Sequence, residues 1–141
     1  MARFLDSSIF LHSYLKAKRK LTEREIKVKE AAKEVLRRVE EGEEVVTTVV
    51  HVSEIANIIE SRIGLRESLQ IVSALLTLPN IKVVEVTPED YRKALPTSTR
   101  YGVSINDSIA YLKMTEMGIR EAYSTDKHFK QLPNIKTLPE I

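Results

Sequence analysis

The stretch MARFLDSSIF, residues 1–10, joins a short apolar segment to an aspartate. Residues 2–5 have the composition of a β-strand, and Asp6 follows them directly. Ser7 and Ser8 come next. A single acid at the end of a strand is often a turn or cap residue. The function of this segment therefore depends on whether other acids meet Asp6 in the folded chain.

The composition predicts a folded chain of one domain. The 141 residues suit a single core, and a hydrophobic content of 43% argues against disorder. The longest apolar stretches fall short of the ~20 residues that cross a bilayer, and Asp6 interrupts the only apolar run that could begin a signal peptide. The absence of cysteine excludes disulfides, thiolate metal sites and cysteine catalysis. We expect one domain over residues 1–141, cytoplasmic and without a membrane partner.

Apolar periodicity predicts strands that alternate with helices. Strands are expected at residues 2–5, 44–48, 81–86 and 121–125, with residues 134–138 as a fifth, edge strand. Helices are expected over residues 22–42, up to residue 64, over residues 66–78, from residue 88 and over residues 104–118. Thr22 and Glu25 have the spacing of a capping box. This alternation predicts an α/β fold with a mainly parallel sheet of four to five strands.

Two further features of the sequence predict structure rather than function: a proline that interrupts a predicted helix and a set of apolar residues at helical spacing. Pro96 is expected to end the helix that begins at Pro88, which would leave residues 97–102 as an exposed connection. The apolar residues of the helix at 66–78 recur at helical spacing and are expected in the core; they are Leu69, Val72 and Leu76.

Four acids are predicted to meet at one edge of the sheet. Ligands of parallel sheets bind beyond the carboxyl ends of the strands. Asp6 and Asp126 each follow a predicted strand, the first and the fourth. Glu54 lies early in the helix after the second strand, and Asp107 lies at the start of a later helix. Each acid alone has a simpler explanation as a cap or surface residue, so the prediction depends on all four together.

Four carboxylates at one place require cations or protons. Two carboxylates about 5 Å apart repel each other by about 3 kcal/mol at an effective dielectric constant of about 20. Hard oxygen ligands suit Mg²⁺ or Mn²⁺ rather than zinc. Such ions can activate water and stabilise the leaving oxygen of a phosphodiester. The acid constellation therefore indicates metal-dependent phosphodiester chemistry.

At these residues the chain resembles the PIN-domain ribonuclease family, most closely the VapC-type toxins of VapBC toxin–antitoxin pairs. The first strand with Asp6-Ser7-Ser8 resembles the segment of the family's first acid, and Glu54 stands where the family places its glutamate. Residues 102–107, which end in Asp107, resemble the third segment. Ser124-Thr125-Asp126 with Phe129 matches the late Ser/Thr-x-Asp-x-x-Phe pattern.

The resemblance implies a three-layer α/β/α sandwich that hydrolyses RNA with Mg²⁺ or Mn²⁺. It assigns four acids to the catalytic metal pocket and two serines to orienting them; these are Asp6, Glu54, Asp107, Asp126, Ser8 and Ser124. It also implies a homodimer and a small antitoxin partner. The chain departs from many relatives, which have asparagine at the position of Ser8.

Basic residues and histidines near the acids provide candidate phosphate contacts. Lys127 and Lys130 flank the late acid, and Arg100 lies in the segment before the third one. The three histidines are scattered and show no metal-ligand spacing, so surface or helix-edge positions are expected for them; they are His12, His51 and His128. Of these, His128 is close enough in sequence to the late acid to reach a phosphate.

Other functions remain open from the residues alone. A non-catalytic RNA-binding or scaffold protein on the same fold is the main alternative to a ribonuclease. A phosphoaspartyl phosphatase would need a second aspartate where Ser8 stands, and a signalling receiver would need an acid directly after a middle strand. The glycines are too far apart for a nucleotide-binding loop.

Overall fold

A computed structural model describes residues 2–140 and shows a five-stranded sheet. The strands are β1 (Arg3–Leu5), β2 (Val45–Thr48), β3 (Ile81–Val84), β4 (Glu121–Tyr123) and β5 (Lys136–Leu138). Their order across the sheet is β3-β2-β1-β4-β5, and every neighbouring pair is parallel. The predicted strands are confirmed, including the edge position of the fifth. All carboxyl ends consequently lie along one edge of the sheet.

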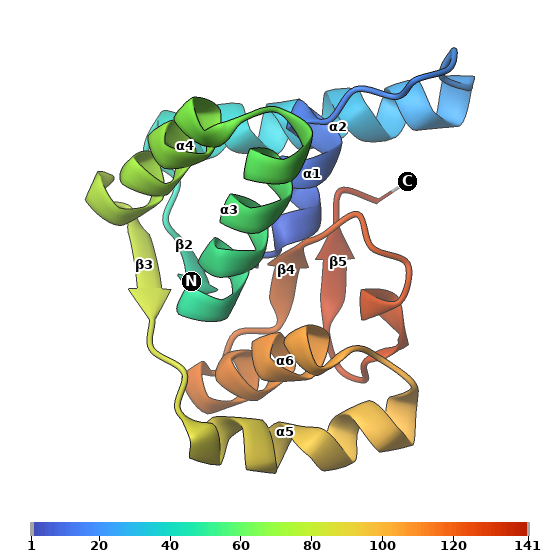
Figure 1. The fold of residues 1–141 in the computed structure, drawn as a ribbon. Helices are drawn as coiled ribbons and strands as arrows, with labels where there is room; N and C mark the ends of the chain where they lie inside the picture. The colour runs from blue at the N-terminus through green and yellow to red at the C-terminus, as the bar shows by residue number, and fades with distance from the viewer. Residues whose placement is uncertain (1, 141) are drawn as a thin grey trace.

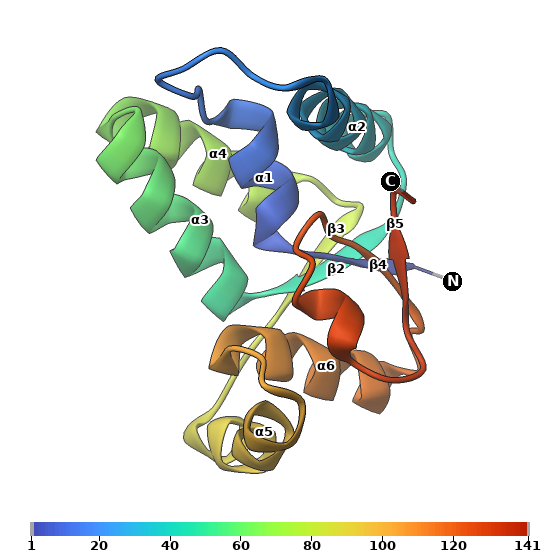
Figure 2. The ribbon, with the colours of Figure 1, turned by 90° about the vertical axis from the view of Figure 1, so that its right-hand side faces the viewer.

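Helices cover both faces of this sheet. They are α1 (Ser7–Tyr14), α2 (Glu23–Glu40), α3 (Val49–Arg62), α4 (Leu65–Thr77), α5 (Pro88–Tyr101) and α6 (Ile105–Met117), with a short 3₁₀ helix η1 (Phe129–Gln131). Helices α1 to α4 lie on one side of the sheet, and α5 and α6 lie on the other (Figures 1 and 2). This confirms the predicted three-layer α/β/α sandwich. Between residues 2 and 140, no helix is long and apolar enough to cross a membrane.

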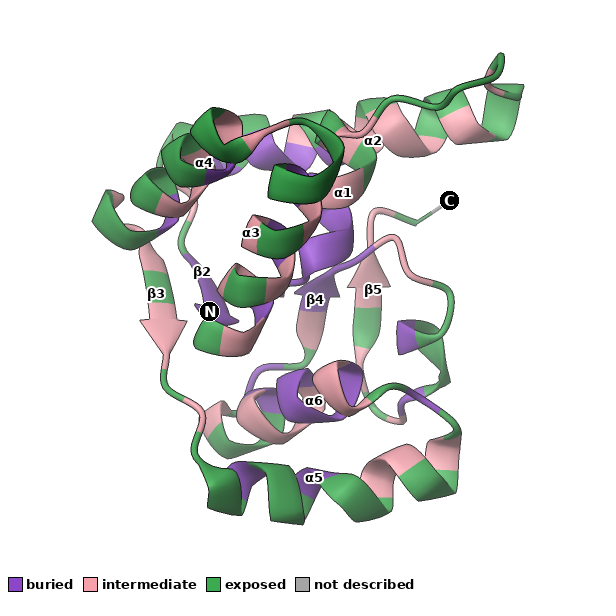
Figure 3. Cartoon of the chain, in the orientation of Figure 1, coloured by how far each residue is buried: buried purple, intermediate pink, exposed green. Residues whose placement is uncertain are grey.

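The alternation of side chains along the strands creates two cores. Leu5, Val45 and Tyr123 are buried against α1, α2, α3 and α4. Phe4 and Val46, their neighbours along the strands, are buried against α6 on the opposite face. Buried residues accordingly line the central strands and the helix faces that cover them (Figure 3). Because β1 is the central strand and both of its faces are covered, its carboxyl end lies in the middle of this edge of the sheet.

Helix α2 begins as its sequence predicts. Thr22 occupies the N-cap position, its hydroxyl accepts from the backbone N–H of Glu25, and the Glu25 carboxylate accepts from the backbone N–H of Thr22. This reciprocal capping box satisfies two N–H groups that would otherwise lack a partner. The segment between α1 and α2 has no regular secondary structure and contains the basic run of residues 16–20.

The prediction that Pro96 ends a helix is wrong. Helix α5 continues through Pro96 to Tyr101 and ends at Gly102, whose φ of 65° provides a left-handed C-cap. Contacts with α6 explain the continuation: the Ser98 hydroxyl hydrogen-bonds to the Ser108 hydroxyl at 2.6 Å and donates to the Ser104 carbonyl at 3.3 Å. These contacts hold the second half of α5 against α6 although proline removes one helical hydrogen bond.

The prediction of a core position is also wrong for two residues of α4. Leu69 and Leu76 are 58% and 62% exposed, respectively. Helix α4 instead buries Leu75 and packs the partly buried Ile71 against the core. The helix is apolar on two adjacent faces, so periodicity alone could not decide which one packs inward.

Replacing Pro96 by alanine should stabilise the protein. Alanine restores a backbone N–H that can donate to the carbonyl of Arg92 and removes the steric conflict of the proline ring. We expect the free energy of unfolding, measured by urea denaturation, to rise by about 1–3 kcal/mol. Thr99→Ala, at an exposed position of the same helix, serves as the control and should change it by less than about 0.5 kcal/mol. An equal or lower stability of Pro96→Ala would contradict this account of α5.

Candidate active site

Asp6 lies at the centre of the edge where the strands end. It follows β1, occupies the N-cap position of α1 and is only 3% exposed, yet its side chain makes no capping hydrogen bond. The Oδ2 atom of Asp6 instead accepts from the Ser8 hydroxyl at 2.6 Å and from the Ser124 hydroxyl at 2.9 Å. A buried carboxylate with two hydroxyl donors is fixed in orientation.

The same two serines connect Asp6 to the loop after β4. The Ser8 hydroxyl accepts from the backbone N–H of Thr125 at 3.0 Å, and the Ser124 hydroxyl accepts from the backbone N–H of Asp126 at 3.2 Å. These hydrogen bonds to the two serine hydroxyls hold the backbone of Asp126 on the same edge as Asp6. These serines were the ones that the sequence resemblance singled out.

Glu54 is held between two helix starts. It lies in the second turn of α3, where the Ser7 hydroxyl donates to Oε1 and the Asn106 amide donates to Oε2 at 3.1 Å. Ser7 is the first residue of α1 and Asn106 is the second residue of α6, and neither was predicted to have a role. Their positions directly before or after a site acid are the signal that could have identified them.

Asp107 is a buried acid whose pKa is shifted by its surroundings. It lies in the first turn of α6, its backbone N–H donates to the Ser104 hydroxyl at 3.1 Å, and its side chain is 6% exposed. Burial, followed by the negative charges of Asp6, Asp126 and Glu54, raises the pKa of Asp107 to about 7, although a hydrogen bond from Ser104 opposes the shift. The four predicted acids are thus close enough to influence one another.

His51 is buried in the site, so the prediction of a surface or helix-edge position is wrong for this histidine. Its ring is 0% exposed, and its Nδ1 atom hydrogen-bonds to the Thr48 hydroxyl at 2.7 Å. Its Nε2 atom lies 3.8 Å from Asp6 Oδ1 and has no hydrogen-bond partner among the residues described. Burial lowers the pKa of His51, although the charges of Asp6 and Glu54 oppose this effect, so the ring is neutral at pH 7. The spacing of three residues between His51 and Glu54 on one helix could have revealed this position.

The exposed side of the site carries histidine and basic residues. The backbone N–H of His128 donates to Asp126 Oδ1 at 2.9 Å, and its ring Nδ1 lies 3.2 Å from the same oxygen. Lys127 and Lys130 are exposed next to it. Arg100, also exposed, places its guanidinium 5.3 Å from the centre of the Tyr101 ring. Among the described residues, His128 is the one of these side chains that contacts a site acid.

The residues at this edge suit a hydrated divalent cation. In residues 2–140, no three acidic or imidazole side chains already stand in a metal-binding arrangement. Mg²⁺ commonly binds through one or two carboxylates and keeps several waters, so it needs no closed protein cage. Both serine hydroxyls donate to Asp6 Oδ2, which leaves Oδ1 facing the unpartnered His51 nitrogen. The carboxylates provide hard oxygen donors and a negative field that an ion would neutralise.

The family of the chain follows from its sequence. The family model for the PIN domain matches residues 3–135, so this chain belongs to the PIN domain family. The membership predicted from the acids and their spacing is confirmed. Among curated proteins, no sequence relative matches the chain.

Solved structures share the fold over nearly the whole chain. VapC20 from Mycobacterium tuberculosis, described as a toxin that cleaves the sarcin–ricin loop, superposes with a TM-score of 0.75 at 20% identity, covering 98% of this chain and 100% of its own. PAE2754 from Pyrobaculum aerophilum has a TM-score of 0.61 at 12% identity and coverages of 98% and 90%. VapBC2 from Rickettsia felis, bound to a DNA fragment from its promoter, has a TM-score of 0.62 at 10% identity, with 97% of each chain covered. At these identities the likeness establishes the fold.

The raised pKa of Asp107 predicts a pH-dependent effect of Asp107→Asn in metal-free protein. The folded pKa of about 7 exceeds the ordinary value of 3.8, so the folded state binds more protons than the unfolded state between these limits. The wild type therefore loses stability as pH rises from about 4 to about 7, and the asparagine variant does not. Urea denaturation in EDTA should show the stability of Asp107→Asn, relative to the wild type, increasing between pH 5 and pH 8 by at most ~3 kcal/mol.

Glu60→Gln provides the control for this comparison. Glu60 is an exposed acid on α3 and has no ion pair with the residues described. Its difference from the wild type should stay the same at both pH values. A constant difference for Asp107→Asn as well would show that Asp107 does not titrate near neutrality.

Proposed function

We propose that this protein is a metal-dependent endoribonuclease that hydrolyses RNA phosphodiester bonds. The observation that carries the proposal is the gathering of four carboxyl groups at one sheet edge, where hydroxyl and amide donors hold Asp6 and Glu54 and the pKa of Asp107 is raised to about 7. A fold gains no stability from gathering like charges. Binding of a cation would neutralise these charges, and a phosphodiester could then bind to the cation. Membership of the PIN domain family agrees with nuclease activity.

The four carboxyl groups would hold the cation. Asp6 and Asp107 are the buried members, and Glu54 and Asp126 are partly exposed. We infer Mg²⁺ or Mn²⁺, because the donors are oxygens and the chain has no cysteine. A bound divalent cation supplies a nucleophile from water at neutral pH and stabilises negative charge at the phosphate.

The remaining groups of the site would orient Asp6, transfer a proton and bind the phosphates of the substrate. Ser8 and Ser124 hold Asp6 through their hydroxyl groups. The carboxyl group of Asp107 can take up or release a proton near neutral pH. The exposed cations would contact phosphates of the substrate; they are Lys127, Lys130 and Arg100.

We further propose that the nuclease is the toxin of a toxin–antitoxin pair. The similarity in fold to VapC20, described as a cleaving toxin, supports this assignment, as does the similarity to VapBC2. A small antitoxin that blocks the acid site would then be a partner. The protein would act in the cytoplasm, where its RNA substrates are found.

A homodimer is proposed as the assembled form. Helix α4 exposes several large apolar side chains that no described residue covers, namely Leu65, Leu69 and Leu76. Adjacent exposed apolar residues on one helix are typical of a protein–protein contact. A second copy or the antitoxin could cover this face.

The cleavage assay uses purified protein and a mixed-sequence single-stranded RNA. We expect cleavage with Mg²⁺ or Mn²⁺ and none with EDTA. Asp107→Asn should lower the cleavage rate at least ~100-fold, the scale at which a group that stabilises the transition state acts. Glu60→Gln, which changes an exposed acid outside the site, should cleave like the wild type.

Two results would contradict the ribonuclease proposal. Cleavage that survives EDTA, or that Asp107→Asn retains in full, would show that the acid site is not the source of activity. A folded wild type that binds RNA and metal but cuts none of a broad set of RNAs would favour the alternative, a non-catalytic RNA-binding protein.

A further inference from the structure

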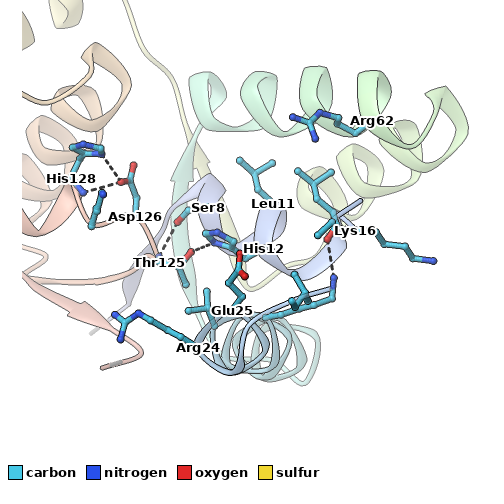
Figure 4. Close-up of a pocket in the computed structure, with 16 residues that line it drawn as sticks. Ser8, Leu11, His12, Lys16, Arg24, Glu25, Arg62, Thr125, Asp126 and His128 are labelled. Carbon is cyan, nitrogen blue, oxygen red and sulfur yellow. Dashed lines mark hydrogen bonds and ion pairs between the residues drawn. The ribbon is translucent and has the colours of Figure 1, made fainter. Parts of the chain in front are cut away.

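A cavity of about 680 Å³ opens beside the acid site. It lies between α1, α2 and the loop that joins β4 to η1, and α3 contributes to its far side (Figure 4). Ser8 and Asp126 belong to its lining, so the cavity begins where the acid site ends. Nothing proposed so far for the acid site requires a cavity of this size.

The cavity has an apolar floor. The residues that form it are half-buried and come from α1, from the segment after α1 and from α2; they are Leu11, Leu15, Leu21 and Val28. Exposed apolar surface of this kind is costly in water, so it favours a ligand with an apolar face. The imidazole of His12 stands at the end of this floor nearest the site, where it hydrogen-bonds to the Thr125 hydroxyl.

Cations surround this floor. Lys16, Arg24, Arg62 and Lys127 line the cavity, and none of the four forms an ion pair with a residue in the described part of the chain. Arg24 on α2 and Arg62 on α3 lie on opposite sides of the cavity (Figure 4). Free cations on several sides of an apolar floor form a surface for a ligand with repeated negative charges.

The acids of the cavity do not neutralise these cations. Glu25 forms an ion pair with Arg19 at 2.7 Å and is a member of the capping box of α2. Asp126 lies at the end of the cavity that adjoins the acid site, with His128 bonded to it. The cationic character therefore extends away from the acids, over the outer part of the cavity.

We propose that this cavity binds single-stranded RNA next to the bond that is cut, with one or two bases on the apolar floor and the flanking phosphates on the cations. The proposal rests on the proposed ribonuclease function, which it deepens by assigning a substrate subsite. Unpaired bases present flat apolar faces that stack on side chains, while the backbone follows a basic groove. A double helix keeps its bases stacked inside and could not use the floor.

The decisive test is RNA binding without cleavage. Fluorescence anisotropy would follow a labelled single-stranded RNA of mixed sequence, in EDTA, over a series of salt concentrations. The Lys16→Ala/Arg24→Ala variant should bind about 10-fold more weakly at low salt. The slope of log K against log salt should fall in magnitude by about 1.4, because each lost phosphate contact with a single strand accounts for about 0.7.

A matched variant separates the cavity from the overall charge. Arg66→Ala/Lys93→Ala also removes one arginine and one lysine, from exposed positions on α4 and α5 without an ion pair among the described residues. It should bind the RNA within about twofold of the wild type. Equal losses in the two double variants would show that binding depends on net charge alone, and this would overturn the proposal.

An abasic oligomer tests the apolar floor. A probe with the same sugar–phosphate backbone but no bases should bind the wild type several times more weakly than the intact RNA, since stacking of each base contributes to affinity. Equal binding of both probes would overturn the assignment of bases to the floor. Displacement of the RNA by polyglutamate at a lower concentration than by unlabelled RNA would identify a protein-docking surface instead and would also overturn the proposal.

Cleavage measured on the same variants separates this proposal from the previous one. If the wild type binds RNA through the cavity but cuts none with Mg²⁺ or Mn²⁺, the subsite stands and the ribonuclease function fails. If the wild type cuts RNA and the Lys16→Ala/Arg24→Ala variant binds and cuts as well as the matched variant, the function stands and the subsite fails.

Discussion

The mutual repulsion of four carboxyl groups at one edge of a parallel sheet is the constraint on which the site depends. The sheet places Asp6 and Asp126 beyond adjacent strands, and the N-terminal turns of α3 and α6 bring Glu54 and Asp107 to the same edge. The protein's own groups reduce part of this repulsion. Hydroxyl and amide groups donate to Asp6 and Glu54, and Asp107 keeps its proton up to a pH of about 7. The remaining negative charge suits a divalent cation.

The surroundings of the acids balance this negative centre. The cavity next to Asp126 carries lysines and arginines, whereas the site itself carries carboxylates. A chain with a net charge of only +2 thus separates its charges into an acidic centre and a basic border. A polyanion could approach the border by electrostatic attraction and meet the acids only where a cation covers them. This arrangement explains how one small surface could bind both a metal ion and the backbone of RNA.

The sequence predicted the layers of the fold well, because strands and helices alternate with strong apolar periodicity and clear caps such as Thr22. It could not predict that Pro96 lies inside a helix, because the contacts that extend α5 come from α6, ten residues further along the chain. The four acids could be singled out because each follows a strand or lies early in a helix. His51 was missed because its only signal, the spacing of three residues to Glu54, does not show which face of α3 packs beside Asp6. The sequence likewise could not predict which face of α4 packs inward, because the helix has apolar residues, Leu69 among them, on two sides.

Calorimetric titration with Mn²⁺ at pH 7 tests the central claim most directly, which is that the gathered carboxyl groups form a cation site. The account predicts saturable binding to the wild type, with release of part of a proton as Asp107 gives up its own, measured from the heats in two buffers of different ionisation enthalpy. Asp6→Asn should abolish this binding, and Glu60→Gln should preserve it. Mn²⁺ binding of equal affinity in Asp6→Asn and in the wild type, or no binding to the folded wild type, would contradict the account.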